Sequence, residues 1–354
     1  MPDWTKGMQQ TFEYYEVEPS TWEDIRRIDT VTTCNISRDE AHETLGYATI
    51  DTTELLGEIY VRIYLVTIQN DVTEKTCLGT FLVQTPRLKY NGKRDDISHD
   101  AYTPLLELKD NPPPIGYFIP KESNIMEMAY RLTADNSRAP VVSGSSDVTS
   151  VSDFVSEADD TWLSYLSDFI VKAKFVFDLD ERSRIIFMPQ TDIASMSPVW
   201  IYTDDNSSIL YPEISQERDL YGIPNVVEIL YTDSEQGVKY KRIVNDNPES
   251  QTSTVSRGRE IIYRETTPEF NGIPSDEEIE DYAIALLRSL SSLEYRLTYK
   301  HGYCPARVGD CVLLNYESAG LSDIKARVIS QSISCQPGCP VEETAVYTVN
   351  MWEG

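Results

Sequence analysis

Short segments rich in β-branched and aromatic residues recur along this chain and constrain its fold more than any other feature. Residues 47–51, 58–68 and 77–84 are rich in Val, Ile, Tyr, Thr and Phe, which favour strands. Within 59–66 both alternating sets of side chains are largely apolar, apart from Arg62, which is typical of a central strand covered on both faces. The C-terminal part repeats the pattern at 293–299, 311–316, 324–335 and 341–352. These runs predict a mainly β chain.

Helices are predicted at four places. Ser20 and Glu23 fit a capping box, which predicts an N-terminal helix with Trp22 on its apolar side. A short helix is expected at about 123–132. Residues 162–173 place apolar side chains at helical spacing and lead into a predicted hairpin, 175–178 and 184–189. A second capping box, at 275–278, opens a helix that extends to about 290, and a strand at 226–231 is expected to pair with 239–243.

Two stretches indicate how these elements are divided. The proline run at 111–116 favours a boundary, and the Ser- and Asp-rich stretch 143–160 a surface linker. We therefore predict a first β-barrel domain at 1–118, an α+β insert with a helix and a hairpin at 119–215, and a second β-barrel domain at 216–354. The expected fold class is mainly β with an α+β insert.

Charge limits what the chain can bind. With 31 Lys and Arg against 58 Asp and Glu among 354 residues, its net charge is −27, which argues against a protein that grips phosphate backbones. The same acidity suits a conduit that must repel its nucleic-acid cargo, although from composition alone a solubility role is the simpler explanation.

Membrane and secretion signals are not found in the sequence. The most apolar run, 59–68, is far shorter than the roughly 20 residues of a spanning helix. The first 20 residues have no basic segment followed by an apolar one. We expect folding in a cytoplasm, where thiols are more often metal ligands, reactive groups or buried residues than disulfides.

Recognisable catalytic motifs are missing, so no enzyme is expected and no catalytic residue is assigned. His42, His99 and His301 lie outside any His-Glu-x-x-His motif, and neither a Gly-x-Ser-x-Gly nor a phosphate-binding Gly-x4-Gly-Lys motif occurs. With so many acids, a close carboxylate pair is expected by chance. Asp178 and Asp180 are interpreted as a hairpin turn rather than a calcium loop, and His301 as a solvated strand end rather than a metal ligand.

Four cysteines form the one constellation above background. Cys304, Cys311, Cys335 and Cys339 fall close together, with Pro and Gly beside them in turns. Four thiolates on short loops suit tetrahedral zinc or an iron–sulfur cluster, although the spacing is not the common one. Buried free thiols and disulfides formed after release from the cell remain alternatives. Cys34 and Cys77 are expected in the core.

The order of several segments resembles that of a known family. Residues 57–69 and 78–86 look like the first tube-forming barrel of tailed-phage hub proteins, and 101–107 and 124–129 are similar to the segment that follows it. Residues 162–189 resemble that family's helix and hairpin, and 283–290 followed by 304–314 resemble the second barrel. The resemblance extends from about residue 20 to 352.

This resemblance implies two split β-barrel tube domains per chain and a homotrimeric, pseudo-six-fold ring. Such a ring adapts the tail tube or distal tail protein ring to a tip, spike or fibre protein, contacts the tape measure protein and lets DNA pass during genome ejection. The protein would belong to the virion, at the tail tip or baseplate, after assembly in the host cytoplasm. A C-terminal iron–sulfur centre in related tail-tip proteins makes the four cysteines candidate ligands. Alternatives are the hub of a bacterial contractile injection system and a tail-associated cell-wall hydrolase.

Overall fold

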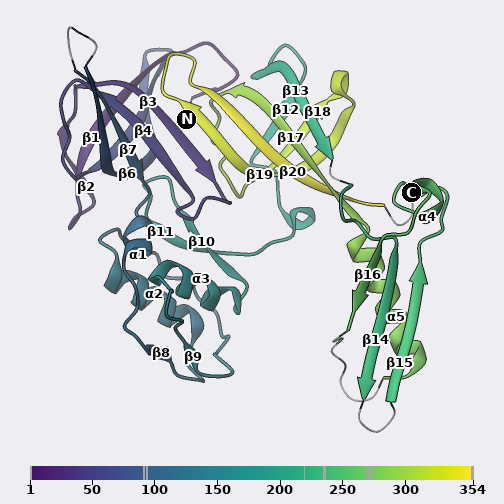
Figure 1. Cartoon of the computed structure of the whole chain (residues 1–354). Helices are drawn as coiled ribbons and strands as arrows, with labels where there is room; N and C mark the ends of the chain where they lie inside the picture. The colour runs from purple at the N-terminus through teal and green to yellow at the C-terminus, as the bar shows by residue number, and fades with distance from the viewer. Residues whose placement is uncertain are drawn as a thin grey trace. The chain divides into compact units, whose positions relative to one another are not determined.

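The computed structural model describes residues 2–90, 92, 95–218, 220–233, 237–266, 268, 270 and 274–351. The chain divides into two compact units (Figure 1). A large unit consists of Met1–Ile214 and Tyr299–Ala345, and a small unit of Ser215–Thr298 and Val346–Gly354. Each is described by itself. No helix in the described ranges is long and apolar enough to cross a membrane.

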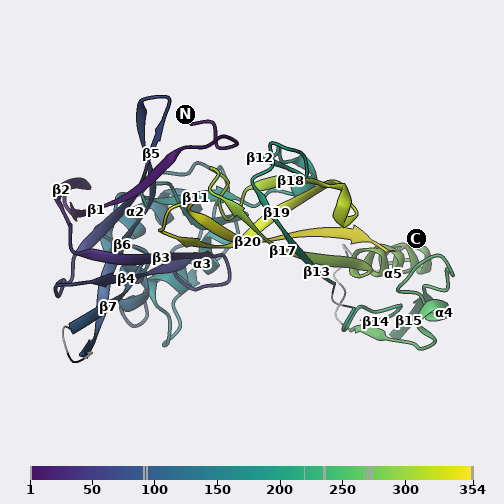
Figure 2. The same ribbon diagram turned by 90° about the horizontal axis from the view of Figure 1, so that it is seen from above.

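The N-terminal strands of the large unit form one antiparallel set. They are β1 (Gln9–Glu18), β2 (Glu23–Arg27), β3 (Val31–Asp39), β4 (Gly46–Thr52), β5 (Tyr60–Gln69), β6 (Val72–Tyr90) and β7 (Asp95–Tyr102), and they pair in the order β3-β4-β7-β6-β5-β1-β2 (Figure 2). The three strands predicted in this region are confirmed as β4, β5 and β6. β5 is buried along most of its length, as expected for a central strand.

The predicted N-terminal helix is wrong. Residues 19–22 make a turn, and β2 follows it. Trp22 has a left-handed backbone with φ 58°, which a helix cannot accommodate. Its ring packs edge-on against Tyr60, and its carbonyl oxygen accepts a hydrogen bond from Arg62. These tertiary contacts override the local capping signal.

The C-terminal strands continue the same sheet. They are β12 (Trp200–Thr203), β13 (Leu210–Arg218), β17 (Ser292–Gly302), β18 (Cys311–Tyr316), β19 (Leu321–Ser334) and β20 (Pro340–Asn350), with two 3-10 turns, η1 (Ile193–Ser195) and η2 (Glu317–Ala319). One half of β19 pairs with β18 and the other half with β3. The β3–β19 pair therefore joins the two strand sets into one 13-stranded sheet, and the mainly β class is confirmed.

Between the two strand sets in the chain lies a mixed segment, residues 106–189, here called the insert, which begins before the α+β insert predicted at 119–215. It contains α1 (Leu106–Asp110), α2 (Ile125–Asn136), α3 (Trp162–Val171), the short pair β8 (Phe118–Ile119) and β9 (Phe154–Val155), and the hairpin β10 (Phe175–Leu179) and β11 (Ile185–Pro189). The predicted helices at 123–132 and 162–173 and the hairpin are confirmed. Apolar residues of α2 and α3 share one core with Val17, Trp22 and Leu82 of the strand set, so the insert packs directly on the sheet.

A three-stranded sheet and one long helix make up most of the small unit. Its elements are β14 (Val226–Asp233), β15 (Gly237–Val244), β16 (Ile262–Glu265), α4 (Thr254–Arg257) and α5 (Asp276–Leu290), with strand order β15-β14-β16. The pairing predicted for 226–231 with 239–243 is confirmed, as is the capping box of Ser275 and Glu278. Ile279, Ala283 and Leu287 bury one face of α5 against the sheet. The three-domain division itself stays a prediction.

Candidate functional site

The four candidate metal ligands lie in three different environments. Cys335 and Cys339 pack with Cys34 in the core of the strand set. Cys304 lies beside Tyr202 and His301, and Cys311 is buried on β18, where its thiol faces the carbonyl oxygen of Val312. Across the described part of the chain, no group of three or more His, Cys, Asp or Glu residues is placed to hold a metal ion. The four thiols are therefore not gathered at one point in this structure, and a zinc or iron–sulfur centre held by all four stays a prediction.

Cys304 borders a buried polar network that links strands β12, β17, β19 and β20. Glu343 is at its centre: the hydroxyl of Tyr299 donates to Oε1 at 2.5 Å and that of Tyr202 at 3.2 Å, while the amide of Gln331 donates to Oε2 at 2.6 Å. His301 Nε2 lies 3.5 Å from Oε2. His301 and Glu343 are both 0% exposed, so every bond of this network forms inside the protein.

Its geometry favours a charged histidine. Nδ1 of His301 donates to the carbonyl oxygen of Gly302 at 2.7 Å, and Nε2 lies 3.1 Å from the Tyr202 oxygen, whose own proton points to Glu343. Both ring nitrogens thus carry hydrogens. Burial acts to lower the pKa of His301, but hydrogen bonds to Cys304 and Glu343 and the charge of Glu343 raise it to about 10.

The glutamate shows the complementary shift. Burial acts to raise the pKa of Glu343, yet the hydrogen bond and charge of His301 and the bonds from Tyr299 and Gln331 hold it below its ordinary value. The pair is therefore ionised near neutral pH. The interpretation of His301 as a solvated strand end is wrong. On β17, His301 lies on the same face as the buried residues Leu297 and Tyr299, and there its imidazole pairs with the buried carboxylate of Glu343.

Arg38 extends the network to the N-terminal strand set. Its guanidinium donates to Gln331 Oε1 at 3.0 Å and to the carbonyl oxygen of Leu78 at 2.7 Å, and Gln331 in turn donates to the carbonyl oxygen of Ala306 at 2.8 Å. Burial lowers the pKa of Arg38 to about 10, which leaves it charged at neutral pH. Arg38 and Gln331 face each other across the β3–β19 pair, so the network ties the two strand sets together at their junction.

The hairpin of the insert meets both strand sets at the same region. The carbonyl oxygen of Arg182 accepts from Trp22 Nε1 at 2.9 Å, and Ser183 Oγ accepts from the backbone N–H of Thr80 at 2.8 Å. From the other strand set, the Arg307 guanidinium donates to the carbonyl oxygen of Leu179 at 3.0 Å. The interpretation of Asp178 and Asp180 as part of a hairpin turn is confirmed, and the turn of residues 180–183 also connects the insert to both strand sets.

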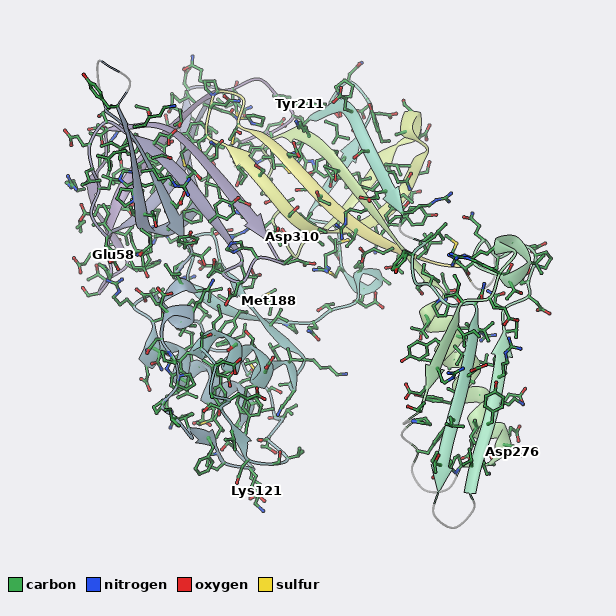
Figure 3. The ribbon with its side chains drawn as sticks, viewed as in Figure 1. Glu58, Lys121, Met188, Tyr211, Asp276 and Asp310 are labelled. Carbon is green, nitrogen blue, oxygen red and sulfur yellow. The ribbon has the colours of Figure 1, made fainter. Side chains whose placement is uncertain are left out.

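A cavity of about 670 Å³ opens beside this joint. Figure 3 labels two of its lining residues, Met188 of β11 and Asp310 of the turn before β18, which lie near each other where the insert meets the strands. Burial raises the pKa of Asp310 and of Asp178, another lining residue. Arg307 and Arg38 also line the cavity. Because it carries both positive and negative groups, the cavity is not a dedicated site for an anion or for a cation.

The titratable groups of these clusters are buried or hydrogen-bonded within the protein. A thiol, an imidazole and a carboxylate do meet at Cys304, His301 and Glu343, but each is at most 1% exposed, so a substrate has no route to them in this structure. The remaining histidines are also engaged locally: His99 accepts from the backbone N–H of Leu56 at 3.2 Å, and His42 lies against the backbone N–H of Thr44 at 3.3 Å.

The sequence contains two signals of buried charged groups that were not used to predict them, one at Arg62 and one at Glu343. Arg62, the one charge in the apolar run 59–66, is fully buried and binds Asp24, Thr80 and Trp22. Glu343 shares the alternating phase of Val341 and Ala345, which are buried on β20, whereas its neighbour Glu342 is exposed. A charge that shares the phase of a strand's apolar residues indicates a buried partner.

No protein-family model matches the chain, and a search of curated proteins finds no match. Solved structures do match. A tail protein from Neisseria meningitidis aligns with a TM-score of 0.63 at 11% identity, over 97% of this chain and 98% of that one. The 43 kDa tail protein of prophage MuSo2 from Shewanella oneidensis aligns with a TM-score of 0.61 at 11% identity, over 96% and 98%.

A Francisella PdpA–VgrG complex is similar too, with a TM-score of 0.56 at 9% identity, over 100% of this chain and 54% of that one. The likeness to the two tail proteins spans nearly the full length of both chains in each comparison. The chain therefore has the mainly β fold of these two tail proteins.

Proposed function

We propose that this protein is a structural subunit of the hub at the tail tip or baseplate of a tailed phage. The observation that carries the proposal is the fold likeness to a tail protein over 97% of this chain and 98% of that one. Fold alone does not assign function, but the alignment extends over nearly the whole of both chains.

In the proposed assembly, three copies form a closed ring with pseudo-six-fold character. Its support is the presence of two strand sets in each chain, so that three chains would present six. A cyclic ring needs contacts between two different faces of each subunit, and two strand sets offer such faces. The ring would adapt the tail tube or distal tail protein ring to a tip, spike or fibre protein.

The charge supports a passive channel. At −27, the protein repels a phosphate backbone, so DNA would slide through the lumen without specific binding. The tape measure protein would contact the same ring before genome ejection. This function places the protein in the virion after assembly in the host cytoplasm.

Native mass spectrometry over a range of protein concentrations tests the proposal. The expected result is a trimer, either of the protein alone or in the presence of its neighbouring ring protein, and a ring in electron micrographs. A strict monomer that never enters particles would refute the hub. In the same preparation, a gel-shift assay at low salt should show no DNA retention, whereas a strong shift would contradict the passive channel.

A second candidate is the hub of a bacterial contractile injection system, with a protein effector as cargo. It is favoured by the likeness to the Francisella PdpA–VgrG complex, with a TM-score of 0.56 over the whole of this chain. Imaging of the native particle separates the two functions: a DNA-filled head on the tail supports the phage, and a headless sheath supports the injection system.

The hub would work by geometry and packing rather than by catalysis. Its support is the burial of Cys304, His301 and Glu343, which are at most 1% exposed. Zymography on host cell wall tests this. A clearing zone that the wild-type protein produces, and that His301→Gln loses, would favour a tail-associated hydrolase instead.

A further inference from the structure

Two cysteines face each other across the junction of the two strand sets. β19 and β3 are antiparallel, with Ser334 opposite Asn35, and one further step in this register places Cys335 opposite Cys34. The backbone N–H of Cys335 donates to the carbonyl oxygen of Cys34 at 2.9 Å. The two residues are therefore cross-strand neighbours although 301 positions separate them in the chain.

Their thiols point to the same side of the sheet. Both pack in the core cluster that contains Tyr14 and Ile36, and the neighbouring Cys34 thiol, together with burial, raises the pKa of Cys335. Directly opposite residues of an antiparallel pair have Cα atoms about 4.5–5.5 Å apart, which lies inside the roughly 4.4–6.8 Å range of disulfides. A bond between the two sulfurs thus needs side-chain rotation and little movement of the backbone.

A third thiol lies nearby but is placed differently. Cys339 is buried in the same cluster at the end of the turn formed by residues 336–338, where its N–H donates to the carbonyl oxygen of Gln336. The cross-strand neighbour of Cys335 is Cys34, whose carbonyl oxygen accepts its backbone N–H. Cys335 is the partly exposed member and Cys34 the buried one, so a dissolved oxidant meets Cys335 first.

We propose that Cys34 and Cys335 are a dithiol that closes to a disulfide in an oxidising environment and covalently joins β3 to β19. The oxidant is a small-molecule disulfide. The Cys335 thiolate attacks it, forms a mixed disulfide and releases one small thiol. Cys34 then attacks the Cys335 sulfur and releases the second, so that two electrons and two protons pass from the cysteine pair to the oxidant.

The position of this bond determines its effect. The β3–β19 pair joins the two strand sets, so the disulfide would fasten them at the point where Arg38 and Gln331 already meet. It would also close a loop that contains most of the chain, which strongly constrains the unfolded state. The reduced protein folds without it, and the oxidised protein gains resistance to unfolding.

The experiment compares the full-length protein before and after incubation with oxidised glutathione. Free thiols are counted, remaining thiols are alkylated, and the digest is searched by mass spectrometry for linked peptides. Free thiols should fall from the six cysteines of the sequence to four, with one linked peptide that contains Cys34 and Cys335. The thermal midpoint should rise by roughly 5 °C or more and return to its starting value with reductant.

Cys335→Ser should abolish the linked peptide and the thermal shift, and because Cys335 is partly exposed this variant should fold. Cys339→Ser is the matched control and should keep both effects, as should Cys311→Ser. A linked peptide that joins Cys335 to Cys339, or six free thiols after prolonged oxidation, would overturn the proposal. So would a thermal shift that Cys335→Ser retains.

Discussion

Replacing Glu343 with alanine should cost more stability than almost any other single change in the large unit. The carboxylate accepts from Tyr299 at 2.5 Å, from Gln331 at 2.6 Å and from Tyr202 at 3.2 Å, and it neutralises His301. Its removal leaves these donors buried without an acceptor. Removal of one partner of a buried ion pair costs about 3–5 kcal/mol, a large fraction of the roughly 5–15 kcal/mol that holds a folded domain together.

Urea unfolding followed by tryptophan fluorescence measures this loss. The matched control is Glu342→Ala at the adjacent position of β20, where the half-exposed carboxylate pairs with Lys300 at 3.0 Å and should contribute less than about 1 kcal/mol. Glu343→Gln should fall between the two, because the amide keeps an acceptor oxygen but does not neutralise His301. A Glu343→Ala loss as small as that of Glu342→Ala would refute the buried network.

Three further perturbations test the same structure. The pKa of His301 is raised from 6.5 to about 10, so its contribution to the free energy of unfolding is complete below pH 6.5 and is lost as the pH rises toward 10. The pKa of Glu343 is lowered, so its contribution to the free energy of unfolding is lost as the pH falls below 4.5. The thermal midpoint should decrease both below about pH 4.5 and toward pH 10. His301→Gln should reduce the decrease at alkaline pH, and a variant with the same alkaline decrease as the wild type would contradict the charged pair. Gly46→Ala should cost about 2–4 kcal/mol in urea unfolding, because its φ is +136° and an added Cβ would lie 2.2 Å from a backbone oxygen. Gly57→Ala, with open space around it, should cost under about 1 kcal/mol, and equal losses would count against the close approach. Arg62→Ala should cost about 3 kcal/mol in the same assay, because the Arg62 side chain is fully buried and its loss leaves the buried Thr80 hydroxyl and Trp22 carbonyl oxygen without their donor. Arg87→Ala on an exposed arm of β6 should be nearly neutral.

Elements with strong local patterns could be predicted from the sequence. The helical spacing at 162–173 and the capping box at 275–278 correspond to α3 and α5, because a regular apolar stripe and a cap are decided within a few turns of chain. The doubly apolar run at 59–66 corresponds to the central strand β5 for a similar reason. Local sequence patterns were sufficient to predict an element wherever no tertiary contact favoured a different backbone conformation.

The capping pattern at Ser20 shows where local chemistry fails. A helix there would leave Arg62 without Asp24 and the Trp22 carbonyl oxygen, and the strand arrangement satisfies this buried guanidinium instead. The cost of an unpaired buried charge far exceeds the value of one helix cap. The sequence around Ser20 gives no local signal that this segment will contact Arg62, some forty positions away.

The candidate metal site shows the same limit of local sequence patterns. Turn-borne cysteines close in sequence suggested one metal centre, yet the structure directs Cys304, Cys311 and the pair Cys335 and Cys339 into separate surroundings. Alternation along a strand sends neighbouring side chains to opposite faces, and strand pairing then decides which distant residue each one meets. Closeness in sequence is therefore a weak predictor of which residues of a β-sheet could bind the same metal ion.

The sequence by itself determined the class of the fold, the helix and hairpin of the insert and the strongly acidic character of the protein, because periodicity and net charge are properties of local composition. Only the tertiary structure decided that β3 pairs with β19, that His301 meets Glu343 and that Cys34 faces Cys335. These contacts join residues tens to hundreds of positions apart. They depend on the register of whole strands, which is set by the summed burial and hydrogen bonding of the sheet rather than by any short segment.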